Sequence, residues 1–129
     1  MIVDSSALVA IMVREHDADK LIDLIGQTGR CKVPAPALVE ASIVLGARGG
    51  QTMLDLLDEY LVKARIAKLS FTADHAAVAA EAFLRGGKGR HAAGLNFGDC
   101  ISYATARLEA MPLLFKGGEF RLTDVECAD

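Results

Sequence analysis

The chain begins with the stretch MIVDSSALVAIM at residues 1–12. Its apolar pair IV predicts a short buried strand over 2–4, and the apolar run that follows predicts a helix over 5–13. Asp4 falls between these two elements. Asp-Ser-Ser before an apolar run is a common helix start, so Asp4 can be a helix N-cap. It also places a carboxylate at the end of a core strand, which suggests a second, chemical role.

The rest of the chain continues this alternation of short strands and helices. Further strands are predicted at 31–34, 66–70 and 113–115, with a short edge strand at 122–125. Further helices are predicted at 16–28, 37–48, 51–65, 73–85 and 99–110, with a break at Gly49-Gly50 and a glycine-rich loop over 86–98. This order indicates an α/β fold whose short parallel sheet is covered by helices on both faces. Sites in such sheets form at the carboxyl ends of strands, where Asp4 lies.

Composition indicates a single domain over 1–129 with an aliphatic core, because 52% of the residues are hydrophobic and there is no Trp. The cysteines Cys31, Cys100 and Cys127 are scattered without metal-ligand spacing, which favours a reducing, cytoplasmic location. The N-terminus has no signal-peptide pattern, and the longest uncharged run is too short to cross a bilayer. We therefore expect no membrane association.

Three acids stand where the pattern would place an apolar or neutral residue. Asp4 follows the first strand, Glu40 lies within APALVEASIVL, and Asp99 lies in GLNFGDCISYA at a helix start. Each has an ordinary explanation: a cap for Asp4, a favourable helix dipole for Asp99, and a salt bridge for Glu40, which we expect to be at least partly buried. If the three converge, their repulsion raises their pKa values, and a divalent cation removes that penalty. An all-oxygen donor set suits Mg²⁺ or Mn²⁺.

Other site chemistries lack their motifs. The string GGKGRH at 86–91 lacks the Ser or Thr of a phosphate-binding loop, and neither a dinucleotide fingerprint nor a G-x-S-x-G elbow is present. No His or Cys pair has zinc-ligand spacing. His16, His75 and His91 are isolated, and we expect the first two to be surface residues at helix starts.

Four stretches together resemble a known family. MIVDSSALVAIM, PAPALVEASIVLGAR, KGRHAAGLNFGDCISYATAR and PLLFKGGEF are similar, in order and spacing, to the PIN domain of VapC-type toxins, over nearly the whole chain. The resemblance implies a PIN-like three-layer sandwich. It also implies an endoribonuclease that uses Mg²⁺ or Mn²⁺, yields a 5′-phosphate and a 3′-hydroxyl, and acts as the toxin of a type II toxin–antitoxin system.

The same resemblance assigns the site residues. It implies that Asp4, Glu40 and Asp99 bind the metal and that Ser6 helps to organise the site. A plain helix-start role for Ser6 stays open.

The fourth acid of the family is less certain from sequence, because its usual K-G-[DNE]-[DE]-F string is KGGEF here. Gly118 stands where many relatives have a polar residue. Glu119 is therefore our expected fourth acid, and Asp124 is the alternative. Because Gly118 replaces a polar residue, a second hypothesis is a non-catalytic PIN-like module that only binds a partner. A phospho-accepting receiver domain is disfavoured, because the strands at 31–34 and 66–70 end without an acid.

Substrate and partners follow from charge and hydropathy. The net charge of −3 argues against binding through bulk charge, so local cations matter. We expect phosphate contacts to an RNA substrate, with tRNA and rRNA as the candidates, from the basic residues Arg85, Lys88, Arg90 and Lys116, although ordinary surface charge explains them equally well. The mean hydropathy of +0.30 predicts a homodimer and a partner groove between helices. The resemblance makes that partner a VapB-type antitoxin whose C-terminal tail covers the acids, often with an Arg entering them.

Overall fold

The four strands form one parallel sheet. The structure is a computed structural model that describes residues 1–89 and 91–129. Its strands are β1 (Ile2–Val3), β2 (Cys31–Pro34), β3 (Ile66–Leu69) and β4 (Leu113–Leu114), in the order β3-β2-β1-β4. All three pairings are parallel, and Ile2 lies between Lys32 on β2 and Leu113 on β4. The predicted parallel α/β sheet is confirmed.

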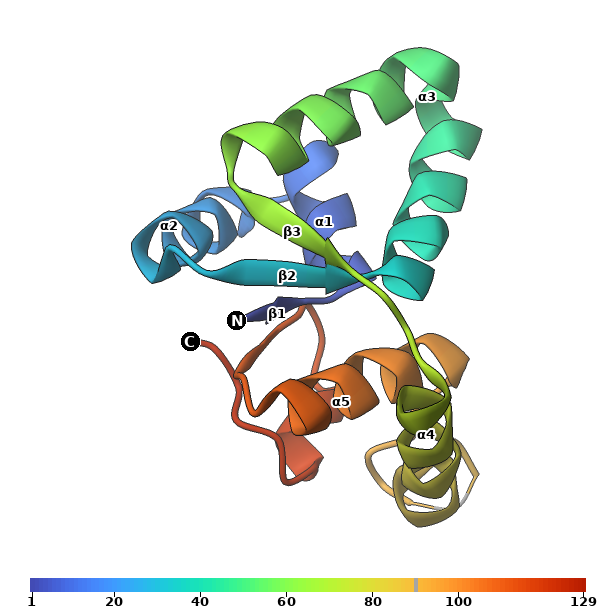
Figure 1. Cartoon of the computed structure of the whole chain (residues 1–129). Helices are drawn as coiled ribbons and strands as arrows, with labels where there is room; N and C mark the ends of the chain where they lie inside the picture. Colours follow the sequence, from blue (N-terminus) through green and yellow to red (C-terminus); the bar gives the residue numbers. More distant parts are fainter. Residues whose placement is uncertain (90) are drawn as a thin grey trace.

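Helices cover both faces of the sheet (Figure 1). The helices are α1 (Ser5–Met12), α2 (Ala18–Thr28), α3 (Ala35–Lys63), α4 (Ala73–Gly86) and α5 (Phe97–Glu109). The first three lie on one side of the sheet, while α5 lies on the other with α4 packed against it. This is the predicted three-layer arrangement.

The two residues of β1 explain the covered faces. Ile2 and Val3 are both fully buried, and consecutive strand residues point to opposite faces. Val3 packs with Leu8 and Leu45 beneath α1 and α3, whereas Ile2 packs with Phe120 on the α5 side. A strand buried on both faces has no polar alternation, which is why it appears in the sequence as a plain apolar pair.

The two helices expected at 37–48 and 51–65 are joined as α3. The backbone leaves helical geometry inside α3 at Gly50, with φ +61° and ψ −153°, a conformation that glycine adopts without steric penalty. Figure 1 shows the sharp turn that results. The predicted break is confirmed, although no loop separates the two halves.

The predicted edge strand at 122–125 is wrong. Residues Glu119–Leu122 form a short 3₁₀ helix, η1, and bends follow it. The C-terminal segment meets the sheet later, through an isolated parallel bridge between Leu113 and Cys127. Phe120 anchors η1 because it is buried against Phe115, with 4.8 Å between the ring centroids.

One helix start and the burial of one histidine also differ from expectation. Helix α2 begins at Ala18 rather than at residue 16. His75 is buried rather than on the surface, and its Nδ1 accepts the backbone N–H of Thr72 at 3.1 Å in the capping box of α4. Within the described residues, no helix combines the length and the apolar character that spanning a membrane requires.

Candidate active site

The predicted acids come from four elements whose ends meet at one edge of the sheet. Asp4 directly follows β1, and Glu40 lies in the second turn of α3, which starts where β2 ends. Asp99 lies in the first turn of α5, and Glu119 opens η1 shortly after β4. The carboxyl ends of parallel strands share an edge, so the fold brings these four acids to the same region.

Asp4 is both a helix cap and a member of this cluster. The residue is only 3% exposed, and Oδ2 accepts hydrogen bonds from the Ser6 N–H at 2.9 Å and the Ser6 hydroxyl at 2.5 Å. Its Oδ1 accepts a hydrogen bond from the hydroxyl of Ser102. A buried carboxylate needs such donors, and these hold it in one orientation. The two roles considered for Asp4 are therefore compatible.

Ser6 and Ser102 organise Asp4 from two sides. The Ser6 hydroxyl also accepts the backbone N–H of Lys116 at 2.9 Å, which ties the end of β1 to the end of β4. Ser102 is fully buried in α5, and its contact with Asp4 was not predicted from the sequence. Its spacing was a usable signal, because residues three apart on a helix lie on the same side and Ser102 follows Asp99 by three.

Glu40 is exposed, and the expected burial is wrong. The first half of α3 packs on the core through one stripe, Ala37, Ala41 and Leu45, and leaves Ile43 67% exposed. Glu40 lies beside that stripe and accepts a hydrogen bond from the Ser5 hydroxyl. The apolar residues around Glu40 in the sequence therefore do not bury it.

Among these acids, Asp99 has the pKa that is most clearly changed by its surroundings. It forms a capping box with Asn96, in which each side chain accepts the other residue's backbone N–H at 2.9 Å. Burial is the main cause that raises the pKa of Asp99 from 3.8 to about 6. The negative charges of Asp4, Glu119 and Glu40 raise it further, against the lowering effect of the Asn96 N–H. The predicted repulsion between converging acids is therefore present at Asp99.

This raised pKa makes the metal-free protein less stable as pH rises. The folded state holds the Asp99 proton more tightly than the unfolded chain, so the penalty is absent below 3.8, grows up to about 6 and is complete above it. The shift corresponds to about 3 kcal/mol, which solvent screening at this half-exposed site reduces to about 1–2 kcal/mol. In EDTA, the free energy of unfolding of the wild type is therefore expected to fall between about pH 4.5 and 7.5. That of Asp99→Asn should fall by about 1–2 kcal/mol less.

Urea unfolding at the two pH values measures this difference. Asp74→Asn is the matched control, because Asp74 is an exposed first-turn acid of α4. Equal pH slopes for Asp99→Asn and the wild type would contradict the expectation.

The donor chemistry fits a hard divalent cation. Within the part of the chain that the structure describes, no three His, Cys, Asp or Glu side chains are already arranged to hold an ion. Asp4, Glu40 and Asp99 instead accept hydrogen bonds from serines and backbone. Their mutual repulsion and their carboxylate oxygens nevertheless suit Mg²⁺ or Mn²⁺. Ion binding would require these side chains to give up some of their present hydrogen bonds.

The two alternatives for the fourth acid lie in different surroundings. Glu119 is close enough to raise the pKa of Asp99. Asp124 instead accepts hydrogen bonds from the Tyr103 hydroxyl at 2.7 Å and from Arg107 at 3.1 Å. Glu119 therefore lies near the other acids, whereas Asp124 is hydrogen-bonded to Tyr103 and Arg107.

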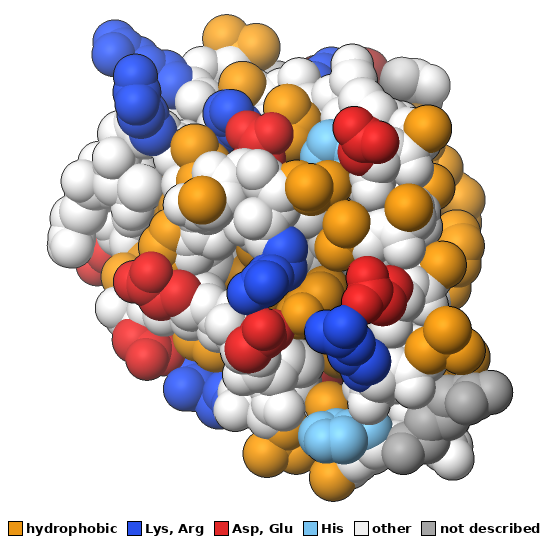
Figure 2. All heavy atoms as spheres, turned by 60° about the horizontal axis from the view of Figure 1, so that its bottom comes forward, with side chains coloured by type: hydrophobic (Ala, Val, Ile, Leu, Met, Phe, Trp, Pro, Cys, Tyr) orange, Lys and Arg blue, Asp and Glu red, His pale blue; other side chains and the backbone are white. Residues whose placement is uncertain are grey.

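The predicted basic residues differ in availability. Arg85 forms an exposed ion pair with Glu81, and Lys88 is exposed. Arg90 lies outside the described residues. Lys116 lies at the cluster, but its ammonium pairs with Glu15 and, at 3.6 Å, with Asp17. Figure 2 shows acidic and basic side chains interspersed on the α4 and α5 side of the molecule.

Comparison with known proteins gives consistent matches over nearly the whole chain. The family model of the PIN domain matches residues 1–126. A protein named ribonuclease VapC from Mycolicibacterium smegmatis is 45% identical over 125 residues, which cover 97% of each chain. Ribonuclease VapC36 from Mycobacterium tuberculosis is 44% identical over 127 residues, which cover 98% of this chain and 91% of the relative.

Solved structures share the fold at low sequence identity. The VapC20 toxin of Mycobacterium tuberculosis, described as cleaving the sarcin-ricin loop, superposes with a TM-score of 0.79 at 17% identity and covers 96% of this chain and 95% of its own. A chain of a toxin-antitoxin complex from Klebsiella pneumoniae has a TM-score of 0.68 at 13% identity, with 95% and 92% covered.

Proposed function

The chain belongs to the PIN-domain family, among the VapC ribonucleases, and on this premise we propose that it is a metal-dependent endoribonuclease, the toxin of a type II toxin–antitoxin system. One observation carries the proposal beyond the family match. The fold brings four acids to one sheet edge, where burial and then the negative charges of Asp4, Glu119 and Glu40 raise the pKa of Asp99. Converging carboxylates that repel one another are typical of a site that binds a cation.

The roles of the acids follow from how each is held. Asp4, Asp99 and Glu40 would hold Mg²⁺ or Mn²⁺, which when bound supplies an activated water and neutralises charge on a phosphodiester. Asp4 is fixed by Ser6 and Ser102, so it is the pre-oriented member of the set. Glu40 is exposed on α3 and is therefore suited to orient the attacking water. The products would be a 5′-phosphate and a 3′-hydroxyl.

The other members of the site support binding of the substrate. We propose Glu119 as the fourth acid, because it lies near Asp99. We propose Arg85 and Lys88 as phosphate contacts, since both are exposed ahead of Asp99 in the chain. Arg90 shares that segment of sequence. Lys116 is less suited to this task, because Glu15 and Asp17 already compensate its charge.

Removal of the metal tests the proposed function. Purified, antitoxin-free protein is expected to cleave tRNA or rRNA in Mg²⁺ or Mn²⁺, to lose that activity in EDTA, and to regain it when Mn²⁺ is added in excess. Cleavage that persists in EDTA would contradict metal dependence. Absence of cleavage on both RNA classes at saturating Mn²⁺ would favour the alternative, a non-catalytic partner-binding module.

An antitoxin site is supported by a groove between α1, α2 and the second half of α3. The groove has a volume of about 370 Å³, and its lining includes Met12, Ile22, Leu56 and Tyr60. The buried hydroxyl of Tyr60 has no hydrogen-bond partner within the described residues. We propose that an apolar helix of a VapB-type antitoxin occupies this groove.

A second hollow lies toward the other end of α1, beside the acids. It is lined by residues that include Ser6, Val9 and Glu40, and α1 runs from it to the first groove. The antitoxin tail would follow α1 to this hollow, where an Arg can pair with the acids. We place the pair in the cytoplasm, which agrees with the free thiols of Cys31, Cys100 and Cys127.

A homodimer is supported by an apolar surface on the first half of α3, α4 and the start of α5. Val39 is 57%, Ile43 67%, Leu84 62% and Phe97 83% exposed. A groove of about 770 Å³, whose lining includes Leu84 and Phe97, runs through this surface. Apolar side chains also line the right-hand edge of the face in Figure 2. A contiguous exposed apolar surface with a groove marks an interaction site, and we propose that a second copy covers it.

The dimer proposal predicts a specific loss of assembly. Phe97→Asp is expected to shift the protein from dimer to monomer in size-exclusion chromatography with light scattering, because burying a charge in an apolar interface is costly. Val62→Asp is the matched control, since Val62 is 79% exposed in the other half of α3. An unchanged dimer in Phe97→Asp, or an equal loss in both variants, would contradict this assignment.

A further inference from the structure

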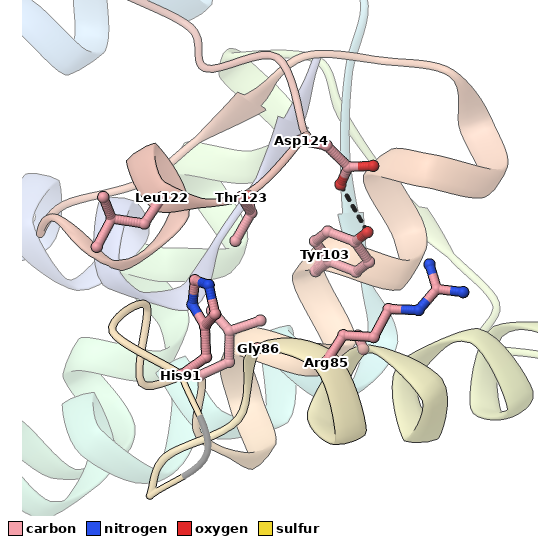
Figure 3. A pocket seen from close by; sticks show the side chains of 9 residues that line it. Arg85, Gly86, His91, Tyr103, Leu122, Thr123 and Asp124 are labelled. Carbon is pink, nitrogen blue, oxygen red and sulfur yellow. Dashed lines mark hydrogen bonds between the residues drawn. The ribbon is translucent and has the colours of Figure 1, made fainter.

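A polar pocket lies beside the acid cluster, and of its lining residues only Arg85 has a role in the reaction proposed above, as a phosphate contact. It has a volume of about 190 Å³ and lies between the end of α4, α5 and the turn after η1. Figure 3 shows Arg85 and His91 on one side of the pocket, and Tyr103, Thr123 and Asp124 across from them.

The pocket is one helical turn away from the acids on two separate elements. Tyr103 follows Asp99 by four residues on α5, so both project from the same side of that helix, about 6 Å apart along its axis. Leu122 follows Glu119 by three residues in η1, again about 6 Å along the axis. A strand of RNA with one bond at the acids would therefore have its neighbouring nucleotide at this pocket.

The walls of the pocket suit a flat ring. The ring of Tyr103 and the apolar side chains of Leu95 and Leu122 line it. An engineered cavity of about 150 Å³ takes up a benzene ring, so this volume accepts one aromatic heterocycle. Unpaired bases in RNA are commonly recognised by stacking on such aromatic side chains.

The polar rim offers a fixed acceptor and a fixed donor. Asp124 is oriented by the Tyr103 hydroxyl at 2.7 Å and by Arg107 at 3.1 Å, and the hydrogen bond from Tyr103 keeps the pKa of Asp124 below its ordinary value. His91 accepts the Ala93 N–H on Nδ1 at 3.0 Å, so in the neutral ring Nε2 carries the proton and can donate. Figure 3 shows the imidazole pointing toward Thr123.

We propose that this pocket binds the base next to the cleaved bond and that Asp124 selects bases with an exocyclic amino group over uracil. The inference rests on the proposed ribonuclease function. A carboxylate accepts a hydrogen bond from an amino group, whereas the carbonyl oxygen that uracil presents at the same edge repels it. Tyr103 supplies the stacking surface and orients Asp124.

The first test is the base preference of cleavage. A random single-stranded RNA pool is cut in Mn²⁺ and the ends are sequenced. The wild type is expected to cut about tenfold less often where uracil occupies one position beside the cut. A factor of about ten corresponds to the loss of one hydrogen bond to a charged group. Asp124→Asn keeps an acceptor for Tyr103 but presents an amide donor, so this preference should fall to about twofold or less.

Asp129→Asn is the matched control. The side chains of Asp129 and Asp124 are both 62% exposed and both pair with an arginine, but Asp129 pairs with Arg121 away from the pocket. Cleavage and preference should be unchanged in this variant. The inference is overturned if the wild type shows no such preference, if Asp124→Asn keeps it, or if Asp129→Asn loses it equally.

A second test does not depend on cleavage. Cytidine and uridine 5′-monophosphates are titrated into Asp99→Asn protein while backbone amides are followed by NMR. The cytidine nucleotide should change the amide chemical shifts of residues 91–95 and 122–124 more than the uridine nucleotide does. This difference should disappear in the double variant that carries both Asp99→Asn and Asp124→Asn. Such shifts without any RNA cleavage by the wild type would support the pocket and refute the proposed function. RNA cleavage without base-dependent chemical shift changes would support the proposed function and refute the pocket.

Discussion

Asp99→Asn is expected to lower RNA cleavage in Mn²⁺ about a hundredfold or more, because it removes the charge of a metal ligand. The change is conservative for the fold. The asparagine Oδ1 can still accept the Asn96 N–H, so the capping box at the start of α5 is preserved. Initial rates on one RNA substrate measure the effect, and circular dichroism checks that both proteins are folded alike.

A matched variant separates the chemical role from a helix-dipole role. Asp74→Asn also removes a first-turn acid, in α4 rather than α5, and should leave the rate unchanged. Equal cleavage by the wild type and Asp99→Asn would remove Asp99 from the site. An equal loss in both variants would show that helix stability, and not metal binding, accounts for the effect.

Gly98→Ala is expected to lower kcat/KM about tenfold or more while the protein stays folded, because the new methyl group would displace Glu40. A Cβ at Gly98 would lie 2.7 Å from Oε2 and 3.0 Å from Oε1 of Glu40, closer than such atoms can approach. The Glu40 carboxylate is the flexible end of an exposed side chain, so it can move away at little cost in stability. Helix propensity even favours alanine over glycine in α5 by up to about 1 kcal/mol.

Gly118→Ala is the control for this effect. A Cβ at Gly118 meets no atom within 4 Å, so the rate should stay within about twofold of the wild type. A double-mutant cycle then locates the cause: in a Glu40→Gln background, Gly98→Ala should reduce the rate much less. An equal reduction in both backgrounds would show that Gly98 acts other than through Glu40.

Local pattern determined most of the elements and indicated three of the acids, Asp4, Glu40 and Asp99. The apolar pair of β1, the glycines at the break in α3 and the acids at helix starts are properties of short segments, and short segments carry the periodicity and capping signals. The alternation of strands and helices then limits the topology to a parallel sheet, because parallel strands need crossover connections. That is why Asp4 could be placed at a functional edge from its sequence position.

The environment of each residue was decided only by tertiary structure. Glu40 is exposed because just one stripe of α3 meets the core, and His75 is buried, with its ring centroid 5.1 Å from that of Phe71. Ser102 reaches Asp4 across 98 positions of chain, and Tyr103 reaches Asp124 across 21. Such contacts depend on how whole elements pack, and no local pattern records that packing. The sequence by itself therefore indicated the acids that we propose for the chemistry, while the packing of distant segments decided what orients them and which pocket lies beside them.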